Sequence, residues 1–196
     1  WKVNGNKILS NNNPVILEWN NKEGIIFKKR IELDNKYLFK ITQEVQNTTN
    51  QSIDLYPYAQ ITRNKIPDDI QNFYISHEGF IGVFDEELKE DDYDDIEENK
   101  IVREANEGWL GITDKYWMTA LVPQKGENFK STFLYKDSFK ANYILSNPTT
   151  INPSSSNSNE VRLFVAAKEV DTIDSYAANQ SIDKFDLVID WGWFYF

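Results

Sequence analysis

The chain of 196 residues has no cysteine, one histidine and one methionine. The lack of cysteine excludes a disulfide framework, cysteine-ligated zinc and thiol catalysis. Neither a G-x-S-x-G nucleophile elbow nor a glycine-rich phosphate loop occurs, so the usual sites of serine hydrolases and P-loop nucleotide-binding proteins are missing. No segment approaches the roughly 18 apolar residues of a membrane-spanning helix. Because the chain starts at Trp1 and shows no signal peptide, we expect it to be part of a longer protein.

Basic residues are fewer than acidic ones. The sequence holds 31 acidic and 21 basic residues, which gives a net charge of -10 and an isoelectric point of about 4.7. An acidic surface repels nucleic acid and anionic lipid headgroups, so neither is predicted as a partner of the surface as a whole. Aromatic residues make up 14% of the chain, which excludes a disordered protein. At this length one core is feasible, with roughly 70% of the unfolded surface buried.

The main pattern is an alternation of apolar and polar residues with a period of two, which is typical of half-buried strands. In the segment 37–45, for example, Tyr37, Phe39, Ile41 and Val45 share one face. About ten segments read as strands, separated by turns rich in Asn, Asp, Gly and Ser. They are 15–19, 25–33, 37–45, 52–62, 79–84, 108–113, 116–122, 129–135, 139–145 and 161–167. The sequence therefore predicts one all-β sandwich domain over residues 1–196.

Two polar segments are predicted to be loops. Residues 85–99 contain ten acidic side chains, and like charges at this density usually stay solvated and mobile. The alternative is a calcium site, because Ca²⁺ prefers carboxylate ligands, but the run lacks the turn glycine of an EF-hand loop. The Ser- and Asn-rich stretch 152–159 is predicted to be a long loop between strands.

One short helix is predicted over 171–179, near the end of the chain. Asp171 is a suitable N-cap residue, and Ile173, Tyr176 and Ala177 fall on one face at helical spacing. After the helix the period of two returns through Phe185, Leu187 and Ile189.

The chain ends on the stretch "DLVIDWGWFYF", whose last six residues hold five aromatics. The pattern predicts an extended exit arm over 185–196, docked on the domain as far as residue 193. Tyrosine and tryptophan prefer the headgroup zone of a bilayer, because their rings are apolar and carry a polar group. We therefore assign the last residues to a membrane interface. They are Trp191, Gly192, Trp193, Phe194, Tyr195 and Phe196.

Candidates for catalysis are few. His77 stands beside Glu78, but neighbouring residues in an extended chain point to opposite faces, so a structural role is favoured over acid–base chemistry. The segment "GWLGITDKYWMTALVPQ" at 108–124 is predicted to be a hairpin whose Trp109 and Trp117 fill the core with Met118. The alternative for this hairpin is an exposed aromatic platform for a sugar or a peptide.

Four motifs carry a resemblance to a known family. The segment 108–124, "LYPYAQITRN" at 55–64, "ISHEGFIGV" at 75–83 and the closing "DLVIDWGWFYF" keep the order that they have in the YidC family of membrane protein insertases of Gram-negative bacteria. The resemblance is to the large periplasmic domain and covers nearly the whole chain. It implies a β-supersandwich, similar to galactose mutarotase-like domains, with a helix near its end.

The resemblance also implies a setting and partners. A membrane anchor helix precedes this domain in the family and five membrane helices follow it, so the domain lies on the periplasmic side of the inner membrane. Family members have further strand-rich sequence before the region that matches Trp1, which implies that the first strands are missing here. The implied partner is the SecDF–YajC complex, through SecF. No cofactor, metal, catalytic residue or nucleic acid is implied.

The expected function is a scaffold and docking module in membrane protein insertion and folding, without enzymatic activity. The residues that match the family motif are interpreted as structural. They are Gly108, Trp109, Gly111, Thr113, Asp114, Lys115, Tyr116 and Trp117. Two alternatives remain open: a carbohydrate- or peptide-binding sandwich module, and an aldose epimerase-like enzyme. An epimerase needs an acid and a base across a pocket, and His77 is the single imidazole in the sequence.

Overall fold

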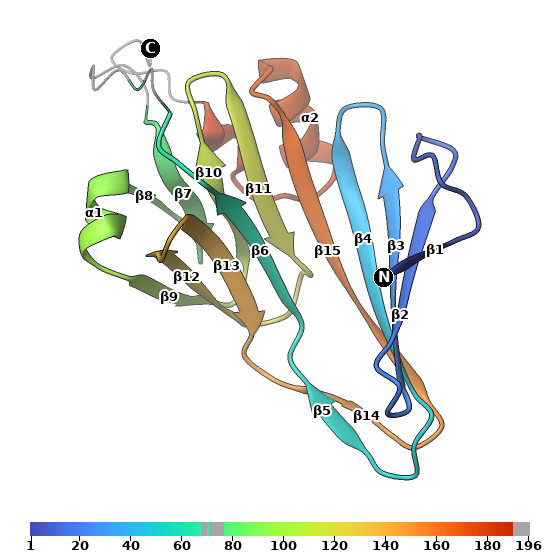
Figure 1. Ribbon diagram of the computed structural model, residues 1–196. Coiled ribbons are helices and arrows are strands. Elements are labelled where there is room, and N and C mark those ends of the chain that lie inside the picture. The colour runs from blue at the N-terminus through green and yellow to red at the C-terminus, as the bar shows by residue number, and fades with distance from the viewer. Residues whose placement is uncertain (68–69, 71–76, 190–196) are drawn as a thin grey trace.

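Two antiparallel sheets packed face to face make up the fold in a computed structural model, which describes residues 1–67, 70 and 77–189 (Figure 1). The larger sheet has nine strands and the smaller one has four. The nine strands, in spatial order, are β1 Lys2–Asn4, β2 Val15–Asn20, β3 Ile25–Leu33, β4 Leu38–Asn47, β15 Ser156–Ala167, β11 Trp117–Pro123, β10 Gly108–Thr113, β7 Gly79–Phe84 and β8 Glu87–Asp91. The four strands are β6 Tyr58–Arg63, β13 Phe139–Leu145, β12 Phe129–Tyr135 and β9 Ile101–Ala105. The predicted all-β sandwich is therefore confirmed.

Smaller elements complete the domain. A two-stranded ribbon of β5 (Ile53–Leu55) and β14 (Thr149–Ile151) runs between the sheets at their lower end (Figure 1). The helices are α1 (Tyr93–Glu98), α2 (Val170–Asn179) and the single 3₁₀ turn η1 (Phe185–Val188).

Aromatic rings fill the core between the two sheets. Phe80 from the large sheet lies 5.0 Å, centroid to centroid, from Phe133 of the small sheet, and Tyr93 of α1 lies 4.8 Å from Phe139. All four side chains are buried. Because aromatic side chains bury the largest apolar area per residue, this cluster is a main source of cohesion between the layers.

A second core lies on the outer face of the large sheet, beneath α2 and η1. The ring of Phe185 in η1 lies 5.4 Å from Trp109 and 5.3 Å from Phe164, in edge-to-face geometry with both. Ile173 and Tyr176 of α2 are buried in the same cluster, and Ala177 packs against it. The helical face predicted from the sequence is therefore confirmed.

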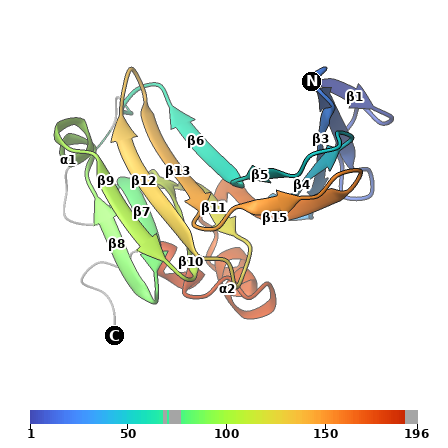
Figure 2. The ribbon, with the colours of Figure 1, turned by 90° about the horizontal axis from the view of Figure 1, so that it is seen from below.

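The small sheet covers only part of the large one. Seen from below, β1 to β4 diverge from β6 and the rest of the small sheet (Figure 2). Ile31 is paired with Ile41, which packs on the inter-sheet core, so the odd-numbered residues of β3 face inward. They include Phe27 and Ile31, whereas the even-numbered ones include Lys28 and Arg30. This half of the sheet thus has a charged outer face and an inner face that is mainly apolar, with Lys29 and Gln43 as its polar members.

Three strand predictions need correction. Residues 52–62 are two strands rather than one, because Pro57 has no N–H for a ladder and lies between β5 and β6. The second half of the stretch 152–159 is strand rather than loop, since β15 starts at Ser156 and pairs with β4. Tyr37 does not share the face of Phe39, because it lies in the preceding turn with φ 66° and is exposed.

The predicted start of the helix at residue 171 is wrong by one residue. The helix α2 begins at Val170 with Glu169 as its N-cap, and Asp171 lies in the first turn, where a carboxylate is favourable next to the helix N-terminus. The helix ends at Asn179, as predicted.

Over residues 185–189 the exit arm is docked on the large sheet, but it is not an extended strand. The 3₁₀ turn η1 places Phe185 and Val188 on the same side at a spacing of three, and both are buried. Leu187 and Ile189 pack partly buried against the same cluster. The predicted membrane-interface residues, 191–196, lie outside the described residues.

The acidic run is not a loop over most of its length, so that prediction is wrong. Residues 85–99 contain β8 and α1. Tyr93 and Ile96, spaced by three, give α1 a buried face, and Asp91 is buried beside Arg103. These apolar and paired residues order a segment whose remaining carboxylates are solvated.

Candidate functional site

The hairpin β10–β11 has the motif residues Gly108 and Gly111 where backbones approach closely. A Cβ atom at Gly108 would lie 1.9 Å from the carbonyl oxygen of Val83, and one at Gly111 would lie 2.1 Å from that of Thr119. Real Cβ atoms do not approach so closely, so only glycine fits at either position. These two motif residues serve the packing of neighbouring strands.

The tryptophans of this hairpin have different environments. Trp109 is fully buried, and its Nε1 donates a hydrogen bond to the carbonyl oxygen of Asp183 at 3.2 Å. Met118 is also buried. Trp117, however, is 62% exposed, so the prediction that it fills the core is wrong. It is the first residue of β11, next to the turn, and its ring remains largely in solvent.

The turn between β10 and β11 joins several polar motif residues. Asp114 pairs with Arg63 of β6 at 2.6 Å, which links the two sheets. Thr113 is buried and accepts a hydrogen bond from the Lys168 ammonium at 3.0 Å. Tyr116 is exposed, and the Lys115 ammonium lies 5.3 Å from the centroid of its ring. The polar motif residues thus contact each other or neighbouring strands, and they form no acid–base pair.

The single histidine contacts the acidic segment rather than its sequence neighbour. His77 Nε2 lies 2.9 Å from the carbonyl oxygen of Phe80, and its Nδ1 lies 3.6 Å from Asp92 Oδ1. The side chain is mostly buried. A ring nitrogen engaged with a backbone carbonyl is typical of a structural histidine. The proximity of Asp92 could not be read from the sequence, since 15 positions separate the two residues.

Tyr93 and Arg63 form a further polar contact near this histidine. The guanidinium carbon of Arg63 lies 5.9 Å from the centroid of the Tyr93 ring. Burial raises the pKa of the Tyr93 hydroxyl to about 12. The phenol is therefore protonated at neutral pH and does not act as a base there.

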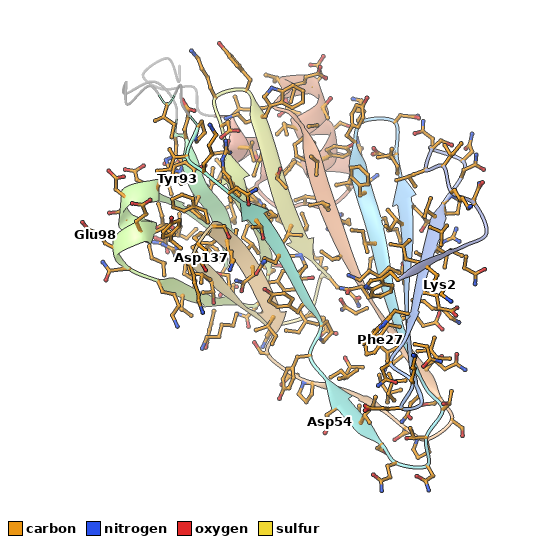
Figure 3. All side chains as sticks on the ribbon, viewed as in Figure 1. Lys2, Phe27, Asp54, Tyr93, Glu98 and Asp137 are labelled. Carbon is orange, nitrogen blue, oxygen red and sulfur yellow. The ribbon has the colours of Figure 1, made fainter. Side chains whose placement is uncertain are left out.

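A hollow of about 320 Å³ lies between the inner face of β3 and β4 and the ribbon β5–β14. Figure 3 shows Phe27 of β3 and Asp54 of β5, from the two strands that flank it. Aromatic and amide side chains make up much of its lining. They are Trp1, Phe27, Tyr56, Tyr58, Gln43, Asn157 and Asn159. Rings beside amides suit a ligand that both stacks and forms hydrogen bonds.

Two details of this hollow point to ligand binding. The ring of Trp19 lies 6.3 Å from that of Trp1 and 5.2 Å from that of Phe27, so a row of rings extends from its edge. Asn159 Oδ1 is buried and has no hydrogen-bond partner among the described residues. A buried unpaired acceptor is costly, and a donor from a ligand or from water would satisfy it.

A larger groove of about 810 Å³ lies on the outer face, along β3, β4, β15 and the end of α2. Its charges are paired within the chain. Lys40 and Glu160 form an ion pair at 2.8 Å, and the hydrogen bond and negative charge of Glu160 raise the pKa of Lys40. Arg162 donates a hydrogen bond to the carbonyl oxygen of Gln180, and burial lowers its pKa. These pairs leave little charge for a ligand.

Residues 1–67, 70 and 77–189 contain no group of three or more His, Asp or Glu side chains arranged to hold a metal ion. Within the same ranges, no helix has the length and apolar character needed to cross a membrane.

A family model described as the YidC periplasmic domain matches residues 1–196. The chain belongs to the YidC periplasmic domain family. The chain is 48% identical over 196 residues to the membrane protein insertase YidC of Pelagibacter ubique. The aligned region covers 100% of this chain and 35% of that protein. The chain is 38% identical over 202 residues to YidC of Brucella melitensis biotype 1, of which it covers 33%. The chain thus spans about a third of the length of these YidC relatives.

Solved structures show what the YidC periplasmic domain is similar to in fold. A galactose mutarotase related enzyme from Lactobacillus acidophilus superposes with a TM-score of 0.51 at 11% identity, over 78% of this chain and 67% of that one. The galactosidase domain of an α-galactosidase–sucrose kinase gives a TM-score of 0.53 at 8% identity, over 83% and 25%. The predicted galactose mutarotase-like supersandwich is therefore confirmed, and at these identities the likeness concerns the fold alone.

Proposed function

We propose that this domain is a non-enzymatic scaffold and docking module on the periplasmic side of the bacterial inner membrane, within a membrane protein insertase. The observation that carries the proposal is the match of the whole chain to insertases, at 48% identity. Since the chain covers 35% of that relative, the insertion activity belongs to the longer protein. The domain contributes a rigid sandwich beside it.

The state of the titratable groups supports docking over catalysis. His77 is engaged with the carbonyl oxygen of Phe80, and Arg63 with Asp114. Burial raises the pKa of the Tyr93 hydroxyl, which makes this phenol still less able to act as a base than an exposed one. A general acid or base must be free to reach a substrate, whereas His77 and Arg63 are held by neighbours within the chain and the Tyr93 hydroxyl is buried.

The partner that we propose is the SecDF–YajC part of the Sec translocon, with SecF in contact with this domain. The test is co-purification from membranes that contain the full-length insertase, with and without residues 1–189. We expect SecF to be recovered with the intact protein and lost when the domain is removed. Equal recovery from both proteins would refute docking through this domain. Insertion of a model membrane protein, measured in the same strains, reports separately on the scaffold role.

A second candidate function is a ligand-binding module that uses the hollow between β3, β4 and the β5–β14 ribbon. The buried, unpaired Asn159 Oδ1 beside aromatic rings favours it. Titration of the chain with millimolar galactose, and separately with an extended peptide, followed by NMR, tests this candidate. Saturable shifts confined to the hollow in the parent, and abolished by Asn159→Ala, support it. A mutarotation assay on an optically active sugar tests the epimerase alternative.

A further inference from the structure

The two ends of the large sheet differ sharply in the side chains that their connections expose. At the lower end in Figure 1, the connections 21–24, 48–52, 106–107 and 124–128 contain no aromatic or aliphatic side chain. At the upper end, by contrast, apolar side chains and lysines belong to three connections and to the first residue of β11. We call this set the aromatic rim. It consists of Ile8, Lys36, Tyr37, Lys115, Tyr116 and Trp117.

Hydrogen bonds place the turns of the rim next to one another along one end of the sheet. The N–H of Val165 in β15 donates to the carbonyl oxygen of Tyr37 at 3.3 Å, and the N–H of Lys168 donates to that of Tyr116 at 2.8 Å. The strand β15 therefore connects the turn before β4 with the turn before β11. The loop that contains Ile8 joins the same edge, since the side chains of Asn11 and Asn35 are hydrogen-bonded.

The exposed rings of the rim are not explained by packing. Tyr37, Tyr116 and Trp117 are 61%, 65% and 62% exposed. Tyr37 also has a φ of 66°, a conformation that glycine or asparagine adopts at lower cost than tyrosine. Neither the core nor the backbone geometry favours a tyrosine there, which indicates that the ring has a role at the surface.

The six rim residues include two lysines and no carboxylate, whereas the chain as a whole is acidic. Within residues 1–67, 70 and 77–189, neither Lys36 nor Lys115 forms an ion pair. Of the nearby carboxylates, Asp114 pairs with Arg63 and Asp34 accepts a hydrogen bond from Tyr176 at 2.6 Å, whereas Glu169 and Asp171 at the start of α2 are exposed. The rim therefore presents two ammonium groups together with aromatic rings.

We propose that the aromatic rim is the membrane-facing edge of the domain and lies in the headgroup layer of the bilayer. This inference rests on the proposed function, which places the domain beside a membrane. Tyrosine and tryptophan prefer the interfacial zone, and lysines extend their ammonium groups to lipid phosphates. A protein partner would require one continuous patch of roughly 800 Å². Side chains on separate turn tips are better suited to a fluid headgroup layer.

The test uses the absence of cysteine, which allows a single environment-sensitive fluorophore to be attached at one chosen site. One variant is Lys115→Cys on the rim, and its matched control is Lys22→Cys in the β2–β3 turn at the opposite end. Each is mixed with vesicles of phosphatidylethanolamine and phosphatidylglycerol that contain nitroxide-labelled lipid. We expect quenching of the probe at position 115 to exceed that at position 22 at least fivefold. Equal quenching at the two sites, or none at position 115, would overturn the proposal.

A second set of variants tests the rings in the Lys115→Cys background. We expect Tyr116→Ser with Trp117→Ser to reduce quenching at least fivefold, at an unchanged melting temperature. The control is Tyr56→Ser with Tyr58→Ser, which removes two exposed rings outside the rim and should leave quenching unchanged. Quenching that survives loss of the rim rings, or that depends equally on the control rings, contradicts the proposal. Because the vesicles contain no translocon, the result is independent of SecF docking and of the insertion assay.

Discussion

Arg103 holds Asp91 through two parallel hydrogen bonds, from Nη1 to Oδ2 at 2.7 Å and from Nη2 to Oδ1 at 2.8 Å. The guanidinium carbon also lies 5.5 Å from the ring centroid of Phe84 and 5.7 Å from that of Phe133. Asp91 is 8% exposed, so the pair links the acidic segment to the edge of the aromatic core.

This pair predicts a large effect for a substitution within a run of like charges. Asp91→Asn leaves the Arg103 guanidinium largely buried without its counter-ion, which costs about 3–5 kcal/mol of unfolding free energy. Asp94→Asn, at an exposed position of α1, should change it by less than about 0.5 kcal/mol. Urea denaturation of the two variants checks the prediction. Equal stabilities would show that the segment contributes nothing to the fold.

A substitution at Tyr143 is expected to change the unfolding free energy in the opposite direction. Its side chain is fully buried, and its hydroxyl has no hydrogen-bond partner among the described residues. Since an unsatisfied buried polar group costs about 1–3 kcal/mol, Tyr143→Phe should raise the unfolding free energy by about 1 kcal/mol. Thermal denaturation followed by circular dichroism measures this change. A clear loss of stability would mean that the hydroxyl is satisfied by an internal water molecule.

Alkaline pH should destabilise the domain through its buried tyrosines. Burial raises the pKa of Tyr93 from 10.0 to about 12 and raises that of Tyr143 as well. Between pH 10 and 12 the unfolded chain therefore loses phenol protons that the folded protein keeps, so stability that is complete below pH 10 is lost as the pH rises. Each such group contributes about 1.4 kcal/mol per pH unit.

Urea denaturation at pH 9, 10 and 11 tests this dependence. Tyr93→Phe should remove one group's share of the slope and leave that of Tyr143. A slope that is identical in parent and variant would show that Tyr93 ionises in the folded protein as readily as in the unfolded chain.

Phe185 predicts how firmly the end of the described chain is attached. Its ring is buried between Trp109 and Phe164, so Phe185→Ala should cost about 3–5 kcal/mol. Leu187→Ala, at a partly buried position of the same turn, should cost clearly less. The melting temperatures of the two variants decide between a docked and a loose segment. If both variants melt with the parent, η1 makes no contribution to stability.

Local patterns predicted most of the strands. The bounds of β3, β7, β10, β12 and β13 coincide with the predicted segments, because the period of two depends only on the chain itself. The helix face of Ile173 and Tyr176 was also predictable, since spacing alone defines it. Family membership could likewise be inferred, because the residues of the motifs and their order along the chain can be read from the sequence.

Other features depend on residues that are distant in the sequence. The acidic run gains structure from Arg103, which lies on another strand, and its charge density by itself predicted a solvated loop. The polar stretch before Val161 becomes a strand because β4 provides a partner for it. Trp117 follows a strand-like pattern, yet nothing in the sequence states whether a second layer covers that position.

The sequence by itself determined the fold class, most of the strands and the family, because alternation, turn chemistry and motif order are properties of neighbouring residues. The tertiary structure decided which sites are buried and which are free. It paired Asp91 with Arg103, exposed Trp117 and gathered Tyr37 and Tyr116 on one rim. Burial and charge pairing depend on what the other sheet or another strand brings close, and no local pattern contains that information.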